Sequence, residues 1–339
     1  METRNDNPLS MDPSAEIERI LTFLVEAVEK NLRRKGVVLG LSGGIDSSVC
    51  AALALRAFGP QRVRVLLMPE RECDPGTTDM GRFVASHLGL EPMTEEISGL
   101  LEASGCYRRR DEAIREVVPD FGEGWTMKIK LPGRLKETGR LNVFKLEVRD
   151  PSGRHAEYRL RPGVLARIIA ATNFKQRCRK MLEYHSADLL NFAVLGTPNR
   201  LEYELGFFVK NGDGAADLKP IAHLYKTQVR ALGRALGLPR EVLEQTPTTD
   251  TYSLAQTQEE FFFGLPLEEL DRCLAGLHAG EAAAATAEAL GWTEEEVERV
   301  RADLRRRIRG TTYLHAPALS LHEGVPGERL RLGEAAGRP

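Results

Sequence analysis

Apolar residues recur at helical spacing near the start of the chain and then give way to a short continuous apolar run. Between residues 12 and 32 they fall at every third or fourth position with charged residues between them, which predicts an amphipathic helix. Residues 37–41 form a short apolar run that begins with two β-branched valines, which is typical of a buried strand. A glycine- and serine-rich turn follows at residues 42–48, then a second helical pattern at 49–58 and a second strand pattern at 63–68. This order is the opening of a doubly wound α/β sheet.

The same alternation continues in both halves of the chain. A helical pattern lies around residues 80–88, and apolar runs at residues 189–197 and 218–222 predict further strands. Together these patterns predict one α/β domain over residues 12–320, with a mostly parallel sheet and helices on both of its faces. Residues 324–339 are rich in Gly, Pro and Arg, and we predict a flexible tail there.

Between the two halves lies a segment with a different period. In residues 125–161, three short runs alternate apolar and charged side chains, and a turn at residues 150–153 joins the last two. A period of two is typical of strands with one buried face, so we predict a three-stranded antiparallel β meander inserted into the domain. The segment holds ten Lys or Arg and four acidic residues. Alternation alone predicts a solvated outer face, and the alternative is a lid or docking surface for an anionic partner.

Composition narrows the class of protein. Of the 339 residues, 42% are hydrophobic and 28% are charged, which is typical of a globular domain. The 47 basic and 49 acidic side chains leave a formal net charge of -2, so no global field attracts nucleic acid or a membrane surface. We therefore expect any anion-binding site to be local.

The cysteines and the N-terminus bear on the cellular compartment. The five cysteines are an odd number without C-x-x-C pairing, which argues against a disulfide framework and against a tetrahedral zinc site. Residues 1–11 lack the apolar core of a signal peptide, and no apolar run approaches the roughly 18 to 20 residues that span a bilayer. We expect a soluble, cytoplasmic protein that binds neither nucleic acid nor membrane.

The turn at residues 42–47, Ser-Gly-Gly-Ile-Asp-Ser, carries the clearest chemical signal. It follows a predicted strand and opens a predicted helix, so its N–H groups and hydroxyls converge where the helix dipole favours an anion. The lysine of a Walker A loop is absent, and the glycine spacing is not G-x-G-x-x-G. We therefore predict a phosphate-binding loop of another type.

This loop resembles the pyrophosphate loop of the adenine-nucleotide alpha-hydrolase superfamily of ATP pyrophosphatases, whose members adenylate a substrate and release pyrophosphate. Later segments are similar, in the same order, to motifs of the ammonia-dependent NAD synthetases. They are residues 173–181 (Asn-x-x-x-Arg-x-Arg-x-Met), 196–202 (Gly-Thr-x-Asn-x-x-Glu), 206–217 (Gly-Phe-Phe-x-Lys-x-Gly-Asp-Gly-x-x-Asp) and 247–248 (Pro-Thr). The ordered set spans about residues 16–275 with the insert excluded, and it is far more specific than any one loop.

The resemblance implies an ATP-dependent amide ligase. Members of this family adenylate the nicotinate carboxylate of deamido-NAD, because AMP is a better leaving group than oxide. Ammonia then displaces AMP, and the products are NAD, AMP and pyrophosphate. Nucleotidyl transfer depends on positioning and on charge neutralisation, so Mg²⁺ is the expected cofactor and ATP the expected co-substrate. The resemblance also implies a homodimer whose partner subunit helps to form the dinucleotide site. The chain has no room for a glutaminase domain, so we expect free ammonia or ammonia from a separate donor protein.

Carried over residue by residue, the resemblance implies a role for each matching position. The expected ATP contacts are Gly40, Leu41, Ser42, Gly43, Gly44, Ile45, Asp46, Ser47, Thr197, Lys226 and Thr248. The expected Mg²⁺ ligands are Asp46 and Glu202, and the expected catalytic residues are Asp46, Lys226 and Thr248. The expected contacts to deamido-NAD are Arg177, Lys210 and Asp217. Each residue alone fits an ordinary capping, turn or surface role, and only the ordered set favours a site.

The sequence departs from the family pattern in three places. The meander at residues 125–161 is extra, and Gln258 stands where the family has an acidic residue. Residues 309–317 lack the basic pair of the family's His-Lys-Arg segment, which contacts the nicotinate half of the substrate. Two alternatives therefore stay open: a ligase that amidates or conjugates a different carboxylate, and a non-catalytic nucleotide-binding relative.

Overall fold

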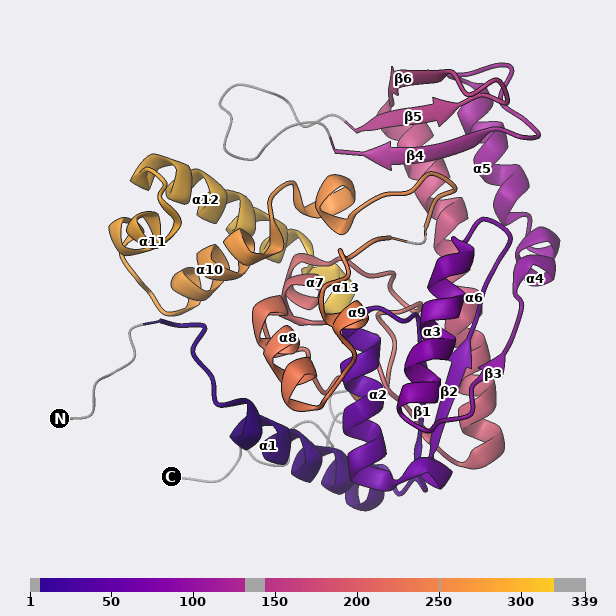
Figure 1. The fold of residues 1–339 in the computed structure, drawn as a ribbon. Coiled ribbons are helices and arrows are strands. Elements are labelled where there is room, and N and C mark those ends of the chain that lie inside the picture. The colour runs from indigo at the N-terminus through magenta and orange to yellow at the C-terminus, as the bar shows by residue number, and fades with distance from the viewer. Residues whose placement is uncertain (1–6, 132–143, 250, 320–339) are drawn as a thin grey trace.

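A four-stranded parallel sheet forms the centre of the fold, with the strand order β3-β2-β1-β7 (Figure 1). The computed structural model describes residues 7–131, 144–249 and 251–319. The strands are β1 (Val37–Gly40), β2 (Val63–Leu67), β3 (Met93–Thr94) and β7 (Ala193–Val194). The register pairs Val37 with both Val63 and Ala193. The predicted α/β fold with its parallel sheet is confirmed.

Two of the predicted strands are shorter than their apolar runs. The run at residues 189–197 yields only β7, because the preceding helix extends to Leu190. The run at residues 218–222 yields only an isolated parallel bridge between Leu195 and Leu218. The other residues of both runs do not pair as strands, because a short apolar run can equally form a helix end or a turn that faces the core.

Helices cover both faces of the sheet, so its strands are apolar on both sides. On β1, Val37 and Leu39 pack into one hydrophobic cluster and Val38 packs into another on the opposite face. A parallel sheet covered in this way needs such continuous apolar strands. The helices of the first cluster are α1 (Pro13–Val25), α2 (Ile45–Phe58), α3 (Pro75–His87), α8 (Lys226–Ala235) and α9 (Arg240–Leu243). Those of the second are α4 (Ser98–Ala103), α5 (Cys106–Arg115) and α6 (Pro162–Leu190).

The remaining helices are α7 (Arg200–Leu205), α10 (Leu267–His278), α11 (Ala283–Leu290), α12 (Glu294–Gly310) and α13 (Thr312–His315). Of these, α10, α11 and α12 form a group on the left in Figure 1, while α7 and α13 lie near the centre. Short π-helical segments are formed by Glu26–Asn31, which continues α1, and by Glu259–Phe263, and a 3-10 turn by Pro60–Arg62. None of the helices in the described part of the chain has the length and apolar character to cross a membrane.

The predicted meander is present as a separate antiparallel sheet with the order β4-β5-β6. Its strands are β4 (Thr126–Lys130), β5 (Lys145–Arg149) and β6 (His155–Arg159). Met127, Ile129, Leu146 and Val148 are buried, and they form a hydrophobic cluster with residues of α5 and α6. The predicted alternation is therefore confirmed for these strands. Residues 132–143 of the insert, and the tail predicted at 324–339, lie outside the described residues.

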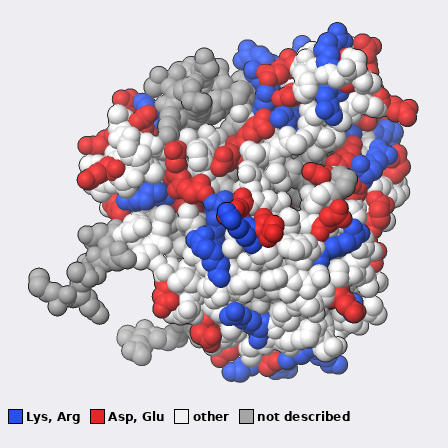
Figure 2. Space-filling view, viewed as in Figure 1, with Lys and Arg blue, Asp and Glu red and all other residues white. Residues whose placement is uncertain are grey.

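The outer face of this sheet carries acidic groups among its lysines. The Nζ of Lys130 lies 2.9 Å from an Oε of Glu147, and the Nζ of Lys145 lies 2.9 Å from an Oε of Glu157. Figure 2 shows basic and acidic side chains intermixed over this part of the surface. The pairing favours the solvated outer face over a docking surface for an anion, because ion pairs within the sheet already neutralise these lysines.

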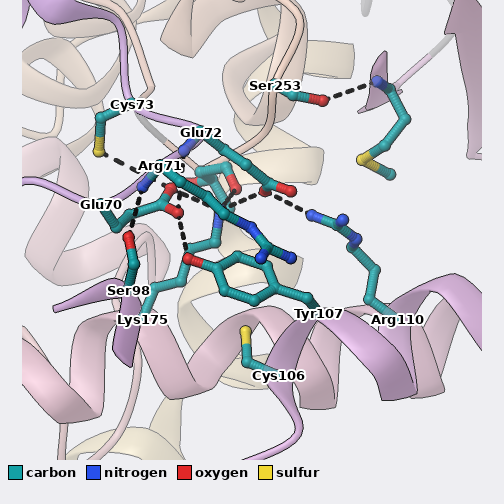
Figure 3. A network of polar contacts seen from close by, with 12 residues as sticks. Glu70, Arg71, Glu72, Cys73, Ser98, Cys106, Tyr107, Arg110, Lys175 and Ser253 are labelled. Carbon is teal, nitrogen blue, oxygen red and sulfur yellow. Dashed lines mark hydrogen bonds and ion pairs between the residues drawn. The ribbon is translucent and has the colours of Figure 1, made fainter. Parts of the chain in front are cut away.

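A network of buried charges joins the loop after β2 to α5 and α6 (Figure 3). The Nζ of Lys175 donates to an Oε of Glu70 and an Oε of Glu72, both at 2.8 Å. The Tyr107 hydroxyl donates to Glu70 at 2.6 Å, and Arg110 donates to Glu72. Burial alone would raise the pKa of Glu72, but Arg110 and Lys175 outweigh it and hold that pKa at about 2. Glu72 is therefore ionised, and its charge is compensated by these cations.

Replacing Lys175 with Met should destabilise the fold strongly. Removing one partner of a buried charge cluster leaves the others uncompensated, and we expect the free energy of unfolding to fall by about 3–5 kcal/mol. Urea unfolding of the wild type and the variant measures the difference. Lys30→Met is the matched control, because Lys30 pairs with Glu26 at 3.1 Å on the exposed surface, where such pairs contribute about 1 kcal/mol or less. Equal stability of the two variants would contradict this account.

Candidate active site

The connections that leave β1 and β7 meet at a switch point of the parallel sheet. The chain moves from β1 to β2 and β3 on one side, and β7 lies on the other side of β1. In open α/β sheets, ligands bind outside the carboxyl ends of the strands at such a point. Here that position lies between the loop after Gly40 and the loop that contains Thr197.

The loop after β1 presents backbone and hydroxyl donors at the start of α2. Gly43 has a φ of +80°, and a Cβ at this position would lie 2.7 Å from the backbone N of Gly81, so only glycine fits the turn. Gly44 occupies the N-cap position of α2 and supplies no capping side chain. The Ser42 and Ser47 hydroxyls lie 3.1 Å apart across the loop. The helix start is therefore free of a side-chain cap and suits an anion.

Asp46, in the first turn of α2, contacts residues from two other elements. Its Oδ1 accepts a hydrogen bond of 3.1 Å from the Asn199 side-chain amide, and its Oδ2 forms an ion pair with the Nζ of Lys226. Lys226 is only 1% exposed. Burial alone would lower the pKa of Lys226, but Asp46 and Glu202 outweigh it and keep that pKa above its usual value. Lys226 therefore stays charged inside the protein.

Glu202 lies beside Asp46 with its carboxylate held by two donors. One Oε accepts from the backbone N–H of Asn199 at 3.2 Å, and the other accepts from the side-chain amide of Gln258 at 3.1 Å. Burial and the neighbouring Asp46 carboxylate raise the pKa of Glu202 to about 7, although Lys226 opposes the shift. Two neighbouring carboxylates disfavour each other's ionised form, and a cation between them would relieve this repulsion.

Two helix starts place these side chains. Asn199 caps α7 and forms a capping box with Glu202, so the carboxylate is fixed one turn into the helix. Asp271 accepts hydrogen bonds from the backbone N–H groups of Lys226 at 3.2 Å and Thr227 at 2.7 Å. Asp271 is fully buried, and burial raises its pKa to about 6. The first turn of α8, which carries Lys226, is therefore anchored from α10.

Asp46, Glu202 and Lys226 border a cavity of about 520 Å³. Its lining includes every predicted ATP-binding and metal-binding residue except Gly43. They are Gly40, Leu41, Ser42, Gly44, Ile45, Asp46, Ser47, Thr197, Glu202, Lys226 and Thr248. The structure thus brings together residues that are spread over more than half of the chain, and it does so around one concave site of the size that small ligands occupy.

The three residues predicted to contact deamido-NAD lie outside the lining of this cavity. The Arg177 guanidinium donates to the backbone carbonyl of Lys210 at 3.3 Å. The Nζ of Lys210 donates to the carbonyl of Tyr313 at 2.7 Å, and Asp217 accepts from a backbone N–H of β7. Arg177 points away because successive residues turn by about 100° around a helix, and it is its neighbour Gln176 that lines the cavity.

Sequence reasoning missed several residues that border the cavity. Gln176, Arg179 and Glu183 form one stripe of α6 along its wall, at the spacing that puts side chains on the same helix face. The Nε of Arg179 donates to the carbonyl of Met68 at 3.1 Å, and Glu183 pairs with Lys180 at 2.6 Å. The helical period of α6 was the signal that could have identified the stripe, since Gln176 and Arg179 belong to the motif at residues 173–181.

The donor set fits a magnesium ion that is shared with a nucleotide. Within the described residues, no group of three or more His, Cys, Asp or Glu side chains is arranged to hold a metal. Asp46 and Glu202 form a pair of carboxylates beside the anion-binding loop. Mg²⁺ is commonly held by one or two carboxylates, with phosphate oxygens and water completing its octahedron. The pair therefore suits Mg²⁺ with ATP better than a metal held by protein alone.

Comparison with known proteins agrees with this geometry. The family model described as NAD synthase matches residues 16–118 and 148–309. The NH(3)-dependent NAD(+) synthetase of Rhizobium meliloti (strain 1021) is 53% identical over 307 residues, covering 91% of each chain. That of Mesorhizobium japonicum is 51% identical over 317 residues, covering 93% of this chain and 99% of the relative. The solved NMN synthetase from Francisella tularensis shares the fold, with a TM-score of 0.62 at 23% identity and coverage of 92% and 99%. The chain belongs to the NAD synthase family.

Proposed function

We propose that this protein makes NAD from deamido-NAD, ATP and ammonia. The nicotinate carboxylate attacks the α-phosphorus of ATP, and pyrophosphate leaves. Ammonia then attacks the carbonyl carbon of the acyl adenylate, the bond to AMP breaks, and a proton is lost to solvent. The observation that carries the proposal is the cluster of Asp46, Lys226 and Glu202 beside the loop at residues 42–47.

Each element of the cluster has a chemical role in this reaction. The backbone N–H groups of residues 42–47 bind the phosphates, and Lys226 stabilises the negative charge that builds up as pyrophosphate leaves. Asp46 and Glu202 would hold Mg²⁺, which would neutralise charge on the phosphate oxygens. Thr248, which also lines the cavity, contacts ATP. The fixed positions of these donors lower the cost of reorganisation in the transition state.

We further propose that a second copy of the chain packs against α6 and completes the dinucleotide site. Met181 is 53% exposed and lies one helical turn beyond Arg177. Arg177 and Lys210 contact each other outside the cavity. A substrate that bridges the cavity and this surface would need a partner to enclose it.

The cysteines support a reducing compartment. The described residues, which include all five cysteines, contain no disulfide, and disulfides are rare in the cytosol. We place the protein in the cytoplasm, where it uses free ammonia or ammonia supplied by a separate donor protein.

The reaction can be tested with purified protein. ATP, Mg²⁺, ammonia and deamido-NAD should yield NAD, AMP and pyrophosphate in equal amounts, measured by chromatography. Nicotinate mononucleotide and other carboxylates serve as competing substrates, and faster amidation of one of these would favour the alternative ligase. Lys226→Met should lower the rate at least about tenfold, because a charge-assisted contact contributes about 1.5–3 kcal/mol. Lys30→Met is the control. Release of ADP would contradict the proposal.

Mg²⁺ binding should depend on pH through Glu202. Because the pKa of Glu202 is raised to about 7, this carboxyl is protonated at pH 6 and must lose its proton to bind a cation. We expect the half-saturating Mg²⁺ concentration for ATP binding to fall about tenfold from pH 6 to pH 8, measured by calorimetry without the acid substrate. Glu202→Gln should bind more weakly and lose this part of the dependence. Equal pH dependence in the wild type and in Glu202→Gln would contradict this role of Glu202, because it would show that only ATP titrates.

The dimer can be tested at α6. Met181→Glu should produce a monomer in size-exclusion chromatography with light scattering, because it buries a charge in the proposed interface. The KM for deamido-NAD should rise at least about tenfold and the KM for ATP should change little. Phe23→Glu is the control, since Phe23 is 46% exposed on α1. A dimeric Met181→Glu variant would contradict the proposed interface.

A further inference from the structure

The free edge of β4 is covered by a segment from the second half of the chain. The backbone N–H of Leu254 donates to the carbonyl of Met127 at 3.1 Å, and the N–H of Leu131 donates to the carbonyl of Glu260 at 3.3 Å. The N–H of Met127 donates to the Ser253 hydroxyl at 2.9 Å, which is drawn in Figure 3. In Figure 1 this segment is the orange chain that runs beneath β4. We name residues 253–260 the covering segment.

Side chains strengthen this contact. Gln256 is only 3% exposed, and its amide donates to the carbonyl of Ile129 at 2.7 Å. The Nζ of Lys128 lies 2.9 Å from a carboxylate oxygen of Glu260 and 3.4 Å from the carbonyl of Ala255. The contact is therefore made by successive residues of β4, with backbone groups and an ion pair together.

The covering segment is bonded in turn to the part of the chain that carries Thr248. The N–H of Thr249 donates to the carbonyl of Gln256 at 2.9 Å, and the N–H of Gln258 donates to the carbonyl of Pro247 at 3.0 Å. Thr248 forms an isolated antiparallel bridge with Thr257. Hydrogen bonds thus join β4 to the covering segment and the covering segment to the residues on either side of Thr248, and the Gln258 amide joins the covering segment to Glu202.

We propose that β4 is a positioning strand, which holds Thr248 and Gln258 at the ATP end of the cavity by pairing with the covering segment. The described residues of the range 244–257 form no helix or extended strand, and a loop of that length without secondary structure of its own gains order from outside contacts. β4 lies within residues 119–147, which the family model leaves unmatched. The strand therefore supplies to this chain a support that the matched segments do not contain. The consequence for catalysis rests on the proposed function.

Hydrogen exchange on the full-length protein without substrate tests the positioning itself. Lys128→Met and Gln256→Ala should each speed exchange of the amides at residues 245–262 at least about tenfold and leave the amides of β5 and β1 unchanged. Lys145→Met is the matched control, because Lys145 lies on the same sheet face and pairs with Glu157 instead. Unchanged exchange at residues 245–262 in both variants, or equally faster exchange in β1, would overturn the proposal.

Activity measurements test whether the ordering of residues 245–262 by β4 matters for catalysis. Lys128→Met should lower kcat for pyrophosphate release about tenfold and leave the unfolding midpoint unchanged. Lys128→Arg should restore most of the lost kcat, and Lys145→Met should have the kcat of the wild type. Equal kcat for Lys128→Met and Lys145→Met would overturn the catalytic role. Because the exchange experiment contains no substrate, its result stands even if the wild type makes no NAD, so failure of the proposed function is distinguishable from failure of the positioning role.

Discussion

The carboxylates of Asp46 and Glu202 and the ammonium group of Lys226 lie together, largely buried, near the start of α2. The rest of the site depends on how their charges balance. Lys226 neutralises Asp46 and remains charged despite its burial. Glu202 is left without an equivalent cation, and its pKa rises to about 7. A buried cluster of this kind is costly unless further charge compensates it. Nucleotide phosphates and Mg²⁺ bring charges of both signs, and they suit the imbalance.

The fold holds this cluster through helix starts and strand ends instead of flexible loops. Asp46 follows β1, Glu202 is fixed by the capping box of α7, and Lys226 begins a helix that Asp271 anchors. Each group thus lies where backbone geometry is most constrained. The same constraint explains Gly43, whose turn leaves no space for a side chain. Preorganised groups need little rearrangement when charge develops on a substrate.

The inserted sheet shows how one pattern can serve two purposes. Its alternation buries Met127 and Ile129 against α5 and α6, as expected for a half-buried strand. The edge of β4 has a second role, because the unpaired backbone groups of a sheet edge can pair with another chain segment. Here it accepts the covering segment. The outer lysines of the sheet, which look like a basic surface in sequence, are largely paired with glutamates of the same sheet or of that segment.

Local patterns in the sequence were sufficient for the parallel sheet, the meander and the glycine turn at residues 42–47, because helix period, strand alternation and glycine turns act over a few residues. The residues predicted to surround ATP could be listed from motifs in order, and all but Gly43 line one cavity. The orientation of Arg177, the stripe of α6 that includes Arg179, and the link from Gln258 to Glu202 required the folded chain. These depend on which helix face meets which neighbour, and residues 33 or more positions apart in sequence contact each other only after packing.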